Sequence, residues 1–84
     1  MKYGIYSYRD VKAGFMPPQA DANDFTAKRG FAYAVNNNNI MNFSPKDYDL
    51  YKVGEFDVDN GIIIGFKVPE LICSGVSVLS EKSE

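Results

Sequence analysis

Residues 50–66, LYKVGEFDVDNGIIIGF, carry the strongest local signal in the chain, because a tight turn lies between two strand-like runs. Leu50–Val58 and Gly61–Phe66 are both strand-like runs, and the second is rich in isoleucine. The dipeptide Asn60-Gly61 supplies the positive φ angles that a tight hairpin turn demands. The stretch therefore predicts an antiparallel hairpin.

Strict alternation along the first arm assigns its side chains to two faces of the sheet. Leu50 and Phe56 fall on one face, and Tyr51 and Glu55 fall on the other. After the second arm, the pattern of Val68–Cys73 fits a further strand and a helical turn equally well.

The N-terminal segment Lys2–Arg9 also has a period of two and is expected to form a strand. One face carries Tyr3, Ile5 and Ser7, and the other carries Gly4, Tyr6 and Tyr8. Asp10–Gln19 then contains a glycine and two prolines, which favour a loop. We expect Phe15 and Met16 to anchor this loop to the core.

One helix is expected from about Asn23 to Asn36. Asn23 or Asp21 can cap it, and apolar residues recur with helical spacing at Ala27, Phe31, Ala34 and Val35. Gly30 inside it suggests that another backbone approaches closely. Ser44-Pro45 then begins a single short turn.

Together these elements predict an α+β fold, an antiparallel sheet of three to four strands with one helix packed on it. A small OB-like barrel with a helix is the alternative. The chain has 84 residues, room for one domain only, which we place at 1–75 with a flexible tail at 76–84. We also expect a homodimer, because so short a chain is marginally stable alone.

Composition limits the functional classes. No apolar run approaches the length of a membrane span, no secretory signal segment is evident, and the single Cys73 cannot form an internal disulfide, so we expect a protein of the cell interior. The net charge is −2, but residues 1–46 carry six Lys/Arg against three Asp, and residues 47–84 carry three Lys against eight Asp/Glu. The positive half either is an ordinary solvated surface or faces an anion such as nucleic acid.

Catalytic and metal-binding patterns are weak. The chain contains no histidine, which removes the commonest general base and metal ligand, and neither a Walker loop nor a dinucleotide fingerprint occurs. The carboxylates near Asp57 and Asp59 lack the downstream Glu of a calcium loop. We therefore expect no enzyme activity, cofactor or metal, and we expect Cys73 to be a small buried side chain.

The remaining signal is aromatic and basic, with six Tyr and six Phe near several cations. Aromatic side chains beside Lys/Arg can stack unpaired bases while the cations meet phosphates. The phenylalanines Phe25, Phe31, Phe56 and Phe66, with Tyr3, are more simply expected in the core. The residues we predict to bind DNA are Lys2, Tyr6, Tyr8, Arg9, Lys12, Lys28, Arg29 and Tyr33. Tyr6, Tyr8 and Tyr51 would form either a ligand platform or a subunit interface.

Several short motifs resemble those of a known family. They are Tyr6-Ser7-Tyr8-Arg9-Asp10 with Gly14-Phe15, the helical Asn23-Asp24 with Arg29 and Phe31, and the stretch from Asp49 to Asp57. In order along residues 1–73, they resemble the small nonstructural protein of gokushovirus-type microviruses, which are single-stranded DNA bacteriophages. The resemblance implies a DNA-related role in genome replication or packaging, in the host bacterial cytoplasm.

Two functions are therefore expected. The first is a non-catalytic phage protein that binds single-stranded DNA. The alternative is a protein-binding adaptor that engages a viral replication protein, the procapsid or a host factor, since the acidic C-terminal half repels DNA and suits a basic partner.

Overall fold

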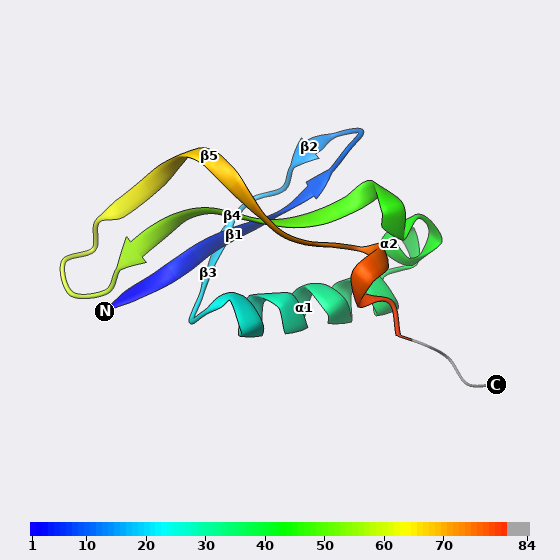
Figure 1. Ribbon diagram of the computed structural model, residues 1–84, viewed down its shortest axis with the longest axis horizontal. Helices are drawn as coiled ribbons and strands as arrows, with labels where there is room; N and C mark the ends of the chain where they lie inside the picture. The colour runs from blue at the N-terminus through cyan, green and yellow to red at the C-terminus, as the bar shows by residue number, and fades with distance from the viewer. Residues whose placement is uncertain (81–84) are drawn as a thin grey trace.

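The computed structural model describes residues 1–80 and contains one sheet with a single long helix, α1, on one face (Figure 1). In chain order the elements are β1 Lys2–Asp10, β2 Gly14–Phe15, β3 Gln19–Asp21, α1 Asp24–Asn37, α2 Asn39–Phe43, the 3-10 turn η1 Pro45–Asp47, β4 Tyr48–Asp57, β5 Ile63–Ser74 and the 3-10 turn η2 Val76–Val78. The predicted α+β class is confirmed.

The sheet is antiparallel, with the strand order β2-β1-β4-β5 and β3 also paired to β1. The short β2 and β3 therefore share one edge of the sheet, and the long β5 forms the other. Within residues 1–80 no ladder joins β5 to β2 or β3. The sheet is a curled half-barrel. It does not close into the OB-like barrel that was the alternative prediction.

The predicted hairpin is confirmed as β4 and β5. The backbone N–H of Asp57 donates to the carbonyl of Ile62 over 2.9 Å, and that of Gly61 donates to the carbonyl of Asp57 over 2.8 Å. The turn is wider than expected, because only Gly61 has a positive φ, of 75°. Val68–Cys73 belongs to β5, which settles the choice between strand and helical turn.

A β-bulge at Val53 changes the faces of β4. Tyr6 of β1 pairs with Lys52, and the preceding Ile5 pairs with Gly54, so Val53 is an extra residue in the ladder. Beyond the bulge, Phe56 lies opposite Tyr3 and Glu55 lies opposite Gly4. The prediction that Phe56 shares a face with Leu50 was therefore wrong, because strict alternation ends at the bulge.

The core lies between α1 and the sheet. Phe31 and Val35 of α1 and Leu50 of β4 have no exposed surface. The other buried apolar residues are Tyr6, Ala27, Met41 and Tyr48. Of the aromatic residues predicted in the core, only Phe31 is fully buried; Tyr3, Phe56 and Phe66 are partly exposed and Phe25 is 71% exposed.

The start of α1 follows the prediction closely. The Asn23 side chain accepts a hydrogen bond from the backbone N–H of Thr26 over 2.9 Å, and the Thr26 hydroxyl lies 3.3 Å from the backbone nitrogen of Asn23. This reciprocal capping box fixes where the helix begins. Gly30 differs from expectation, because no atom would lie within 4 Å of a Cβ at that position.

The segment predicted as a loop between β1 and α1 carries β2 and β3. The Ser7 hydroxyl donates to the Met16 carbonyl over 2.6 Å, and the Met16 side chain packs against the core. Phe15 does not, because it lies on the opposite face of the sheet and is 47% exposed.

Residues 76–80, predicted as the start of a flexible tail, lie against α1. The Asn36 side-chain amide donates to the Val78 carbonyl over 3.0 Å and accepts from the backbone N–H of Ser80 over 2.9 Å. The rest of the predicted tail, 81–84, lies outside the described residues.

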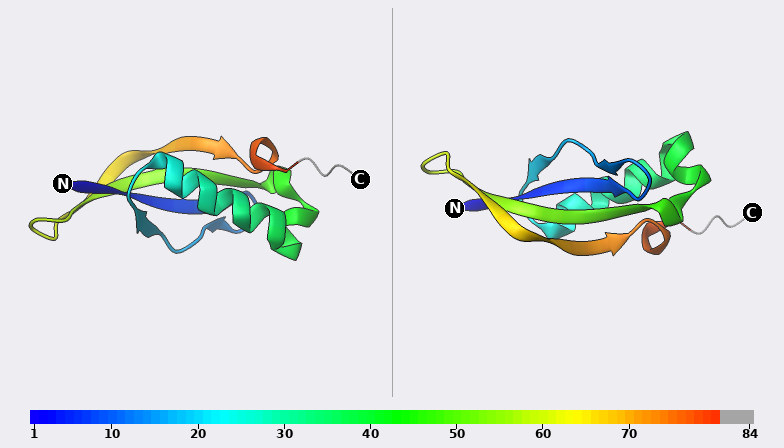
Figure 2. Two further views of the ribbon diagram at one scale, coloured as in Figure 1. Left: turned by 90° about the horizontal axis from the view of Figure 1, so that it is seen from below. Right: turned by 90° about the horizontal axis from the view of Figure 1, so that it is seen from above.

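The molecule is long and thin, at 48 × 26 × 16 Å, with a radius of gyration of 13.4 Å. A compact chain of this length has a radius of gyration of about 12 Å. Seen from below, α1 crosses in front of the strands, and seen from above it lies behind them (Figure 2). The upper face of the sheet, which we call the open face, therefore has no helix over it. Along residues 1–80, no helix is long and apolar enough to span a membrane.

Two glycine substitutions should have opposite effects on stability. A Cβ at Gly54 would lie 2.5 Å from the Ile64 carbonyl oxygen, so the β4–β5 backbones must move apart in Gly54→Ala. We expect that variant to lose about 1–3 kcal/mol of unfolding free energy. Gly30→Ala meets nothing and should gain about 0.5–1 kcal/mol from helix propensity. Urea unfolding measures both, and equal effects would contradict the packing described for Gly54.

Candidate nucleic-acid interface

The eight residues predicted to bind DNA do not form one surface. Tyr6 and Tyr8 lie between the sheet and α1, and Lys2 lies at the start of β1. Arg9 and Lys12 flank the turn that leads into β2. The remaining three, Lys28, Arg29 and Tyr33, lie together on α1.

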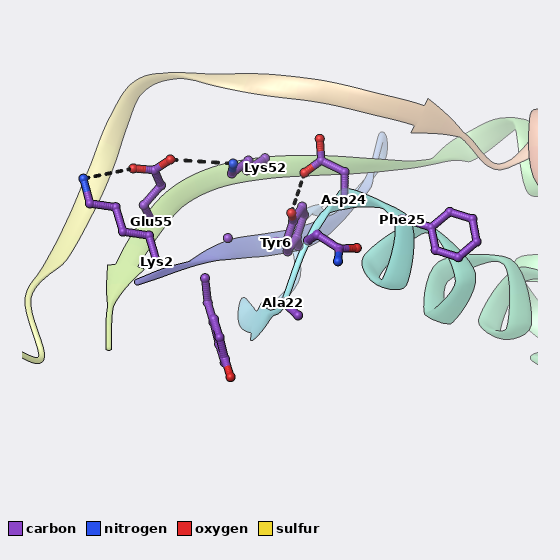
Figure 3. Close-up of a pocket in the computed structure, with 10 residues that line it drawn as sticks. Lys2, Tyr6, Ala22, Asp24, Phe25, Lys52 and Glu55 are labelled. Carbon is purple, nitrogen blue, oxygen red and sulfur yellow. Dashed lines mark hydrogen bonds and ion pairs between the residues drawn. The ribbon is translucent and has the colours of Figure 1, made fainter. Parts of the chain in front are cut away.

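Tyr6 is part of the core and cannot stack a base in this structure. It is 3% exposed, and its ring lies over Gly4, where a Cβ would collide with it. Its hydroxyl donates to a carboxylate oxygen of Asp24 over 2.5 Å (Figure 3). Burial, followed by this hydrogen bond and the negative charge of Asp24, raises the pKa of the Tyr6 hydroxyl well above its usual range. Tyr6 therefore ties the first turn of α1 to β1.

Tyr8 has a similar structural role. Its ring centroid lies 5.0 Å from that of Phe31, with the planes tilted by 59°. The side chain is half-buried, and burial raises the pKa of its hydroxyl. Both tyrosines point toward α1 because they share the Gly4 face of β1, so neither lies on the open face.

Lys2 lies at a hollow beside the start of α1, together with Lys52 and Glu55 (Figure 3). The Lys2 ammonium is 3.9 Å from one Glu55 oxygen, and the Lys52 ammonium is 3.7 Å from the other. Asp24 adds a second carboxylate to the same hollow. With two lysines and two carboxylates, the hollow has no excess of positive charge with which to attract phosphate.

Arg9 belongs to an aromatic group on the open face. Its guanidinium lies 5.9 Å from the ring centroid of Phe15, and the Phe15 ring meets the Tyr51 ring edge-on at 5.3 Å. Arg9 pairs across the ladder with Asp49, and the Lys12 ammonium lies 3.8 Å from Asp47. The cations at this end of the sheet therefore also have acidic neighbours.

The outer side of α1 differs from these regions. Phe25, Arg29 and Tyr33 recur every four residues, so they form one stripe along the helix, opposite the buried residues Ala27 and Phe31. Phe25 is 71% exposed and Tyr33 is 72% exposed. Phe25 also belongs to the lining of the hollow that Figure 3 shows. We call Phe25, Lys28, Arg29 and Tyr33 the α1 stripe.

The α1 stripe is the part of the predicted site with unopposed positive charge. Lys28 and Arg29 form no ion pair with any carboxylate of residues 1–80, and residues 25–46 contain no Asp or Glu. Lys28, Arg29 and Phe25 also line a shallow groove with Ala32 and Val78. This arrangement combines exposed aromatic rings with free cations.

The sequence predictions included three of these four residues and missed Phe25, which was expected in the core. The signal was present, because Phe25 is four residues before Arg29 and eight before Tyr33 and is out of phase with Ala27, Phe31 and Val35. Phenylalanine is more often buried than exposed, so Phe25 was assigned to the core by its residue type and not by its position in the helical period.

The residues described contain little else that suggests chemistry. Within residues 1–80 no three Asp, Glu or Cys side chains gather in a group that would hold a metal ion. Cys73 is half-buried, packs against the core, and has a thiol pKa that burial raises, so its reactive thiolate is disfavoured.

The fold and surface define a small α+β protein with a basic and aromatic helix face. A family model described as Phage ORF5 protein matches residues 3–78. The chain therefore belongs to the Phage ORF5 protein family and is a bacteriophage protein. No curated protein and no solved structure significantly matches the chain.

The buried tyrosines predict a loss of stability at alkaline pH. The folded protein raises the pKa of Tyr6, Tyr8 and Tyr48, so folding favours their neutral forms. Their contribution is fully present below the ordinary pKa of about 10 and is lost as pH rises above it. Urea unfolding below and above pH ~10 should show this fall, with a smaller fall in Tyr6→Phe. Ultraviolet absorbance should show fewer than six tyrosinates before unfolding; all six titrating in the folded protein near pH ~10 would contradict the assignment.

Proposed function

We propose that this chain is the small nonstructural protein of a gokushovirus-type microvirus and that it binds single-stranded DNA through the α1 stripe. It acts by binding, without catalysing a reaction, during genome replication or packaging in the host bacterial cytoplasm. The observation that carries the proposal is the pair of exposed rings, Phe25 and Tyr33, on either side of the unpaired Arg29.

The spacing of the stripe suits a flexible strand. Phe25 and Tyr33 are eight residues apart, which is about 12 Å along an α-helix. Each ring can stack one unpaired base, and Lys28 and Arg29 lie between them to meet the phosphates. Stacking needs bases whose faces are free, so the stripe favours single-stranded over double-stranded DNA.

Charge sets an upper limit on non-specific affinity. The whole chain has a net charge of −2, and Lys2, Lys12 and Lys52 are close to carboxylates. Few cations are left to release counterions from DNA, so the electrostatic contribution to binding is small. Affinity then depends more on stacking than it does in strongly basic DNA-binding proteins.

The alternative function is the protein-binding adaptor, and the open face is the observation that favours it. Phe15, Tyr51 and Leu71 lie on this face without a covering helix, and Phe15 and Leu71 are 47% and 56% exposed. Such a surface suits a viral replication protein, the procapsid or a host factor. Absence of DNA binding by the intact protein would favour this function.

The stacking residues can be tested against a matched aromatic control. Phe25→Ala and Tyr33→Ala should each weaken binding of a labelled single-stranded oligonucleotide by roughly 1–3 kcal/mol. Phe43→Ala removes a side chain that is 90% exposed on α2 and should leave affinity unchanged. Fluorescence anisotropy measures all three, with a duplex of the same sequence for comparison. Equal affinities for wild type and both stripe variants would exclude the α1 stripe.

The cations are tested by the salt dependence of the same titration. In Lys28→Ala and Arg29→Ala the slope of log affinity against log salt should be reduced by about 0.7 each, the value for one phosphate contact on a single strand. Lys12→Ala, which removes a lysine near Asp47, serves as the control and should leave the slope nearly unchanged. A slope that falls only in the control would place the DNA at the β1–β2 turn instead.

A further inference from the structure

The two edges of the sheet are protected to different degrees. One edge consists of β2 and β3, which are two and three residues long and are separated by Pro17 and Pro18. Short strands and prolines are features that prevent edge-to-edge pairing. The other edge is β5, which is 12 residues long and pairs only with β4 within residues 1–80 (Figure 1).

The start of β5 and the residue just before it are exposed and apolar. Ile62, Ile63 and Ile64 are 53%, 67% and 44% exposed. An uncovered edge strand with isoleucines in succession offers both unpaired backbone groups and apolar surface. We propose that this edge pairs with the same edge of a second copy, so that the protein is a homodimer with one continuous sheet.

Backbone hydrogen bonding fixes which residues face the free edge. Asp57 donates to Ile62, so Ile62 bonds to β4, and two residues further the same applies to Ile64. The backbone N–H and C=O groups of the alternate residues Ile63 and Gly65 therefore point away from β4. These are the groups that a second copy would bind.

An antiparallel pairing about a two-fold axis at Ile64 satisfies these groups. Ile63 then exchanges two hydrogen bonds with Gly65 of the partner subunit, and Gly65 does the same with Ile63 of the partner subunit. A Cβ at Gly65 would meet nothing within 4 Å, so there is room above it for the isoleucine side chain opposite. The two Ile64 side chains meet at the axis, and the surface is complementary to itself.

The same strand explains why assembly stops at two. β5 contains Pro69, which has no backbone N–H, and four residues, 66–69, lie opposite the single residue Val53 in the ladder with β4, three more than regular pairing would place there. This bulge limits regular pairing to the residues before it, Ile62–Gly65. Because each copy uses that edge once and the other edge is blunted, the pair is closed.

The pairing deepens the proposed function without depending on it. A two-fold axis through paired antiparallel edges is perpendicular to the sheet, so both α1 helices lie on the same side. Two α1 stripes would then face one DNA strand. The mass of the assembly is measured without DNA, so a failure of this inference is distinguishable from a failure of DNA binding.

Sedimentation of the intact protein at tens of micromolar tests the proposal. We expect twice the chain mass of 9.4 kDa for wild type and the chain mass for Ile64→Lys, which places two like charges at the axis. Val68→Lys is the matched control, because Val68 is 75% exposed on the same strand but lies in the bulge, and it should remain a dimer. A monomeric wild type, or a dimeric Ile64→Lys, would overturn the proposal.

A charge-exchange experiment tests the position of the axis. Ile64→Asp alone should also be monomeric, whereas an equimolar mixture of Ile64→Lys and Ile64→Asp should form a heterodimer, because opposite charges then meet. Circular dichroism confirms that each variant is folded. Two folded monomeric variants that do not associate when mixed would exclude an axis at Ile64.

Discussion

The structure depends on the burial of one core cluster between α1 and the sheet, with Phe31 and Val35 of α1 and Leu50 of β4 at its centre. These three side chains are the largest with no exposed surface, and full burial of each contributes about 1.5–3 kcal/mol. A helix of 14 residues is about 21 Å long, whereas the molecule is 48 Å long. One helix therefore cannot cover the sheet. The apolar residues beyond its reach, on the open face and along β5, remain exposed in the single chain.

The sequence predicted the elements better than their faces. Local signals act over a few residues, so Asn23 as a cap and Gly61 in the turn identified the helix and the hairpin correctly. Faces depend on every residue of a strand, and a single extra residue at Val53 moved Phe56 to the side of Tyr3. Nothing in the residues around Val53 marks the bulge except Gly54, whose missing side chain admits the Ile64 carbonyl. Glycine also occurs in strands without a bulge, at tight bends and close backbone approaches, so Gly54 alone could not predict one.

The candidate site shows the same limit in another form. Tyrosines beside cations predicted stacking on β1, but Tyr6 and Tyr8 lie on the face that α1 covers, and sequence alone could not decide which face that would be. On α1 the helical period separates buried from exposed positions directly, so the exposure of Arg29, Tyr33 and Phe25 could be predicted from the sequence. In a helix, the period of the apolar residues identifies the buried side. In a strand with aromatic residues on both faces, the alternation does not show which face is buried.

The exposed apolar edge of β5 and the α1 stripe fit a single arrangement, in which a dimer presents two stripes to one DNA strand. A stripe with two rings and two cations makes few contacts, and a chain of net charge −2 gains little from general attraction to DNA. Linking two such stripes raises the effective concentration of the second once the first is bound, without any new contact within either chain. The edge pairing proposed at β5 would supply that link and would leave the outer side of α1 free. On this argument the exposed isoleucines at the start of β5, which α1 does not cover, are the surface on which the second copy would pair in the proposed dimer.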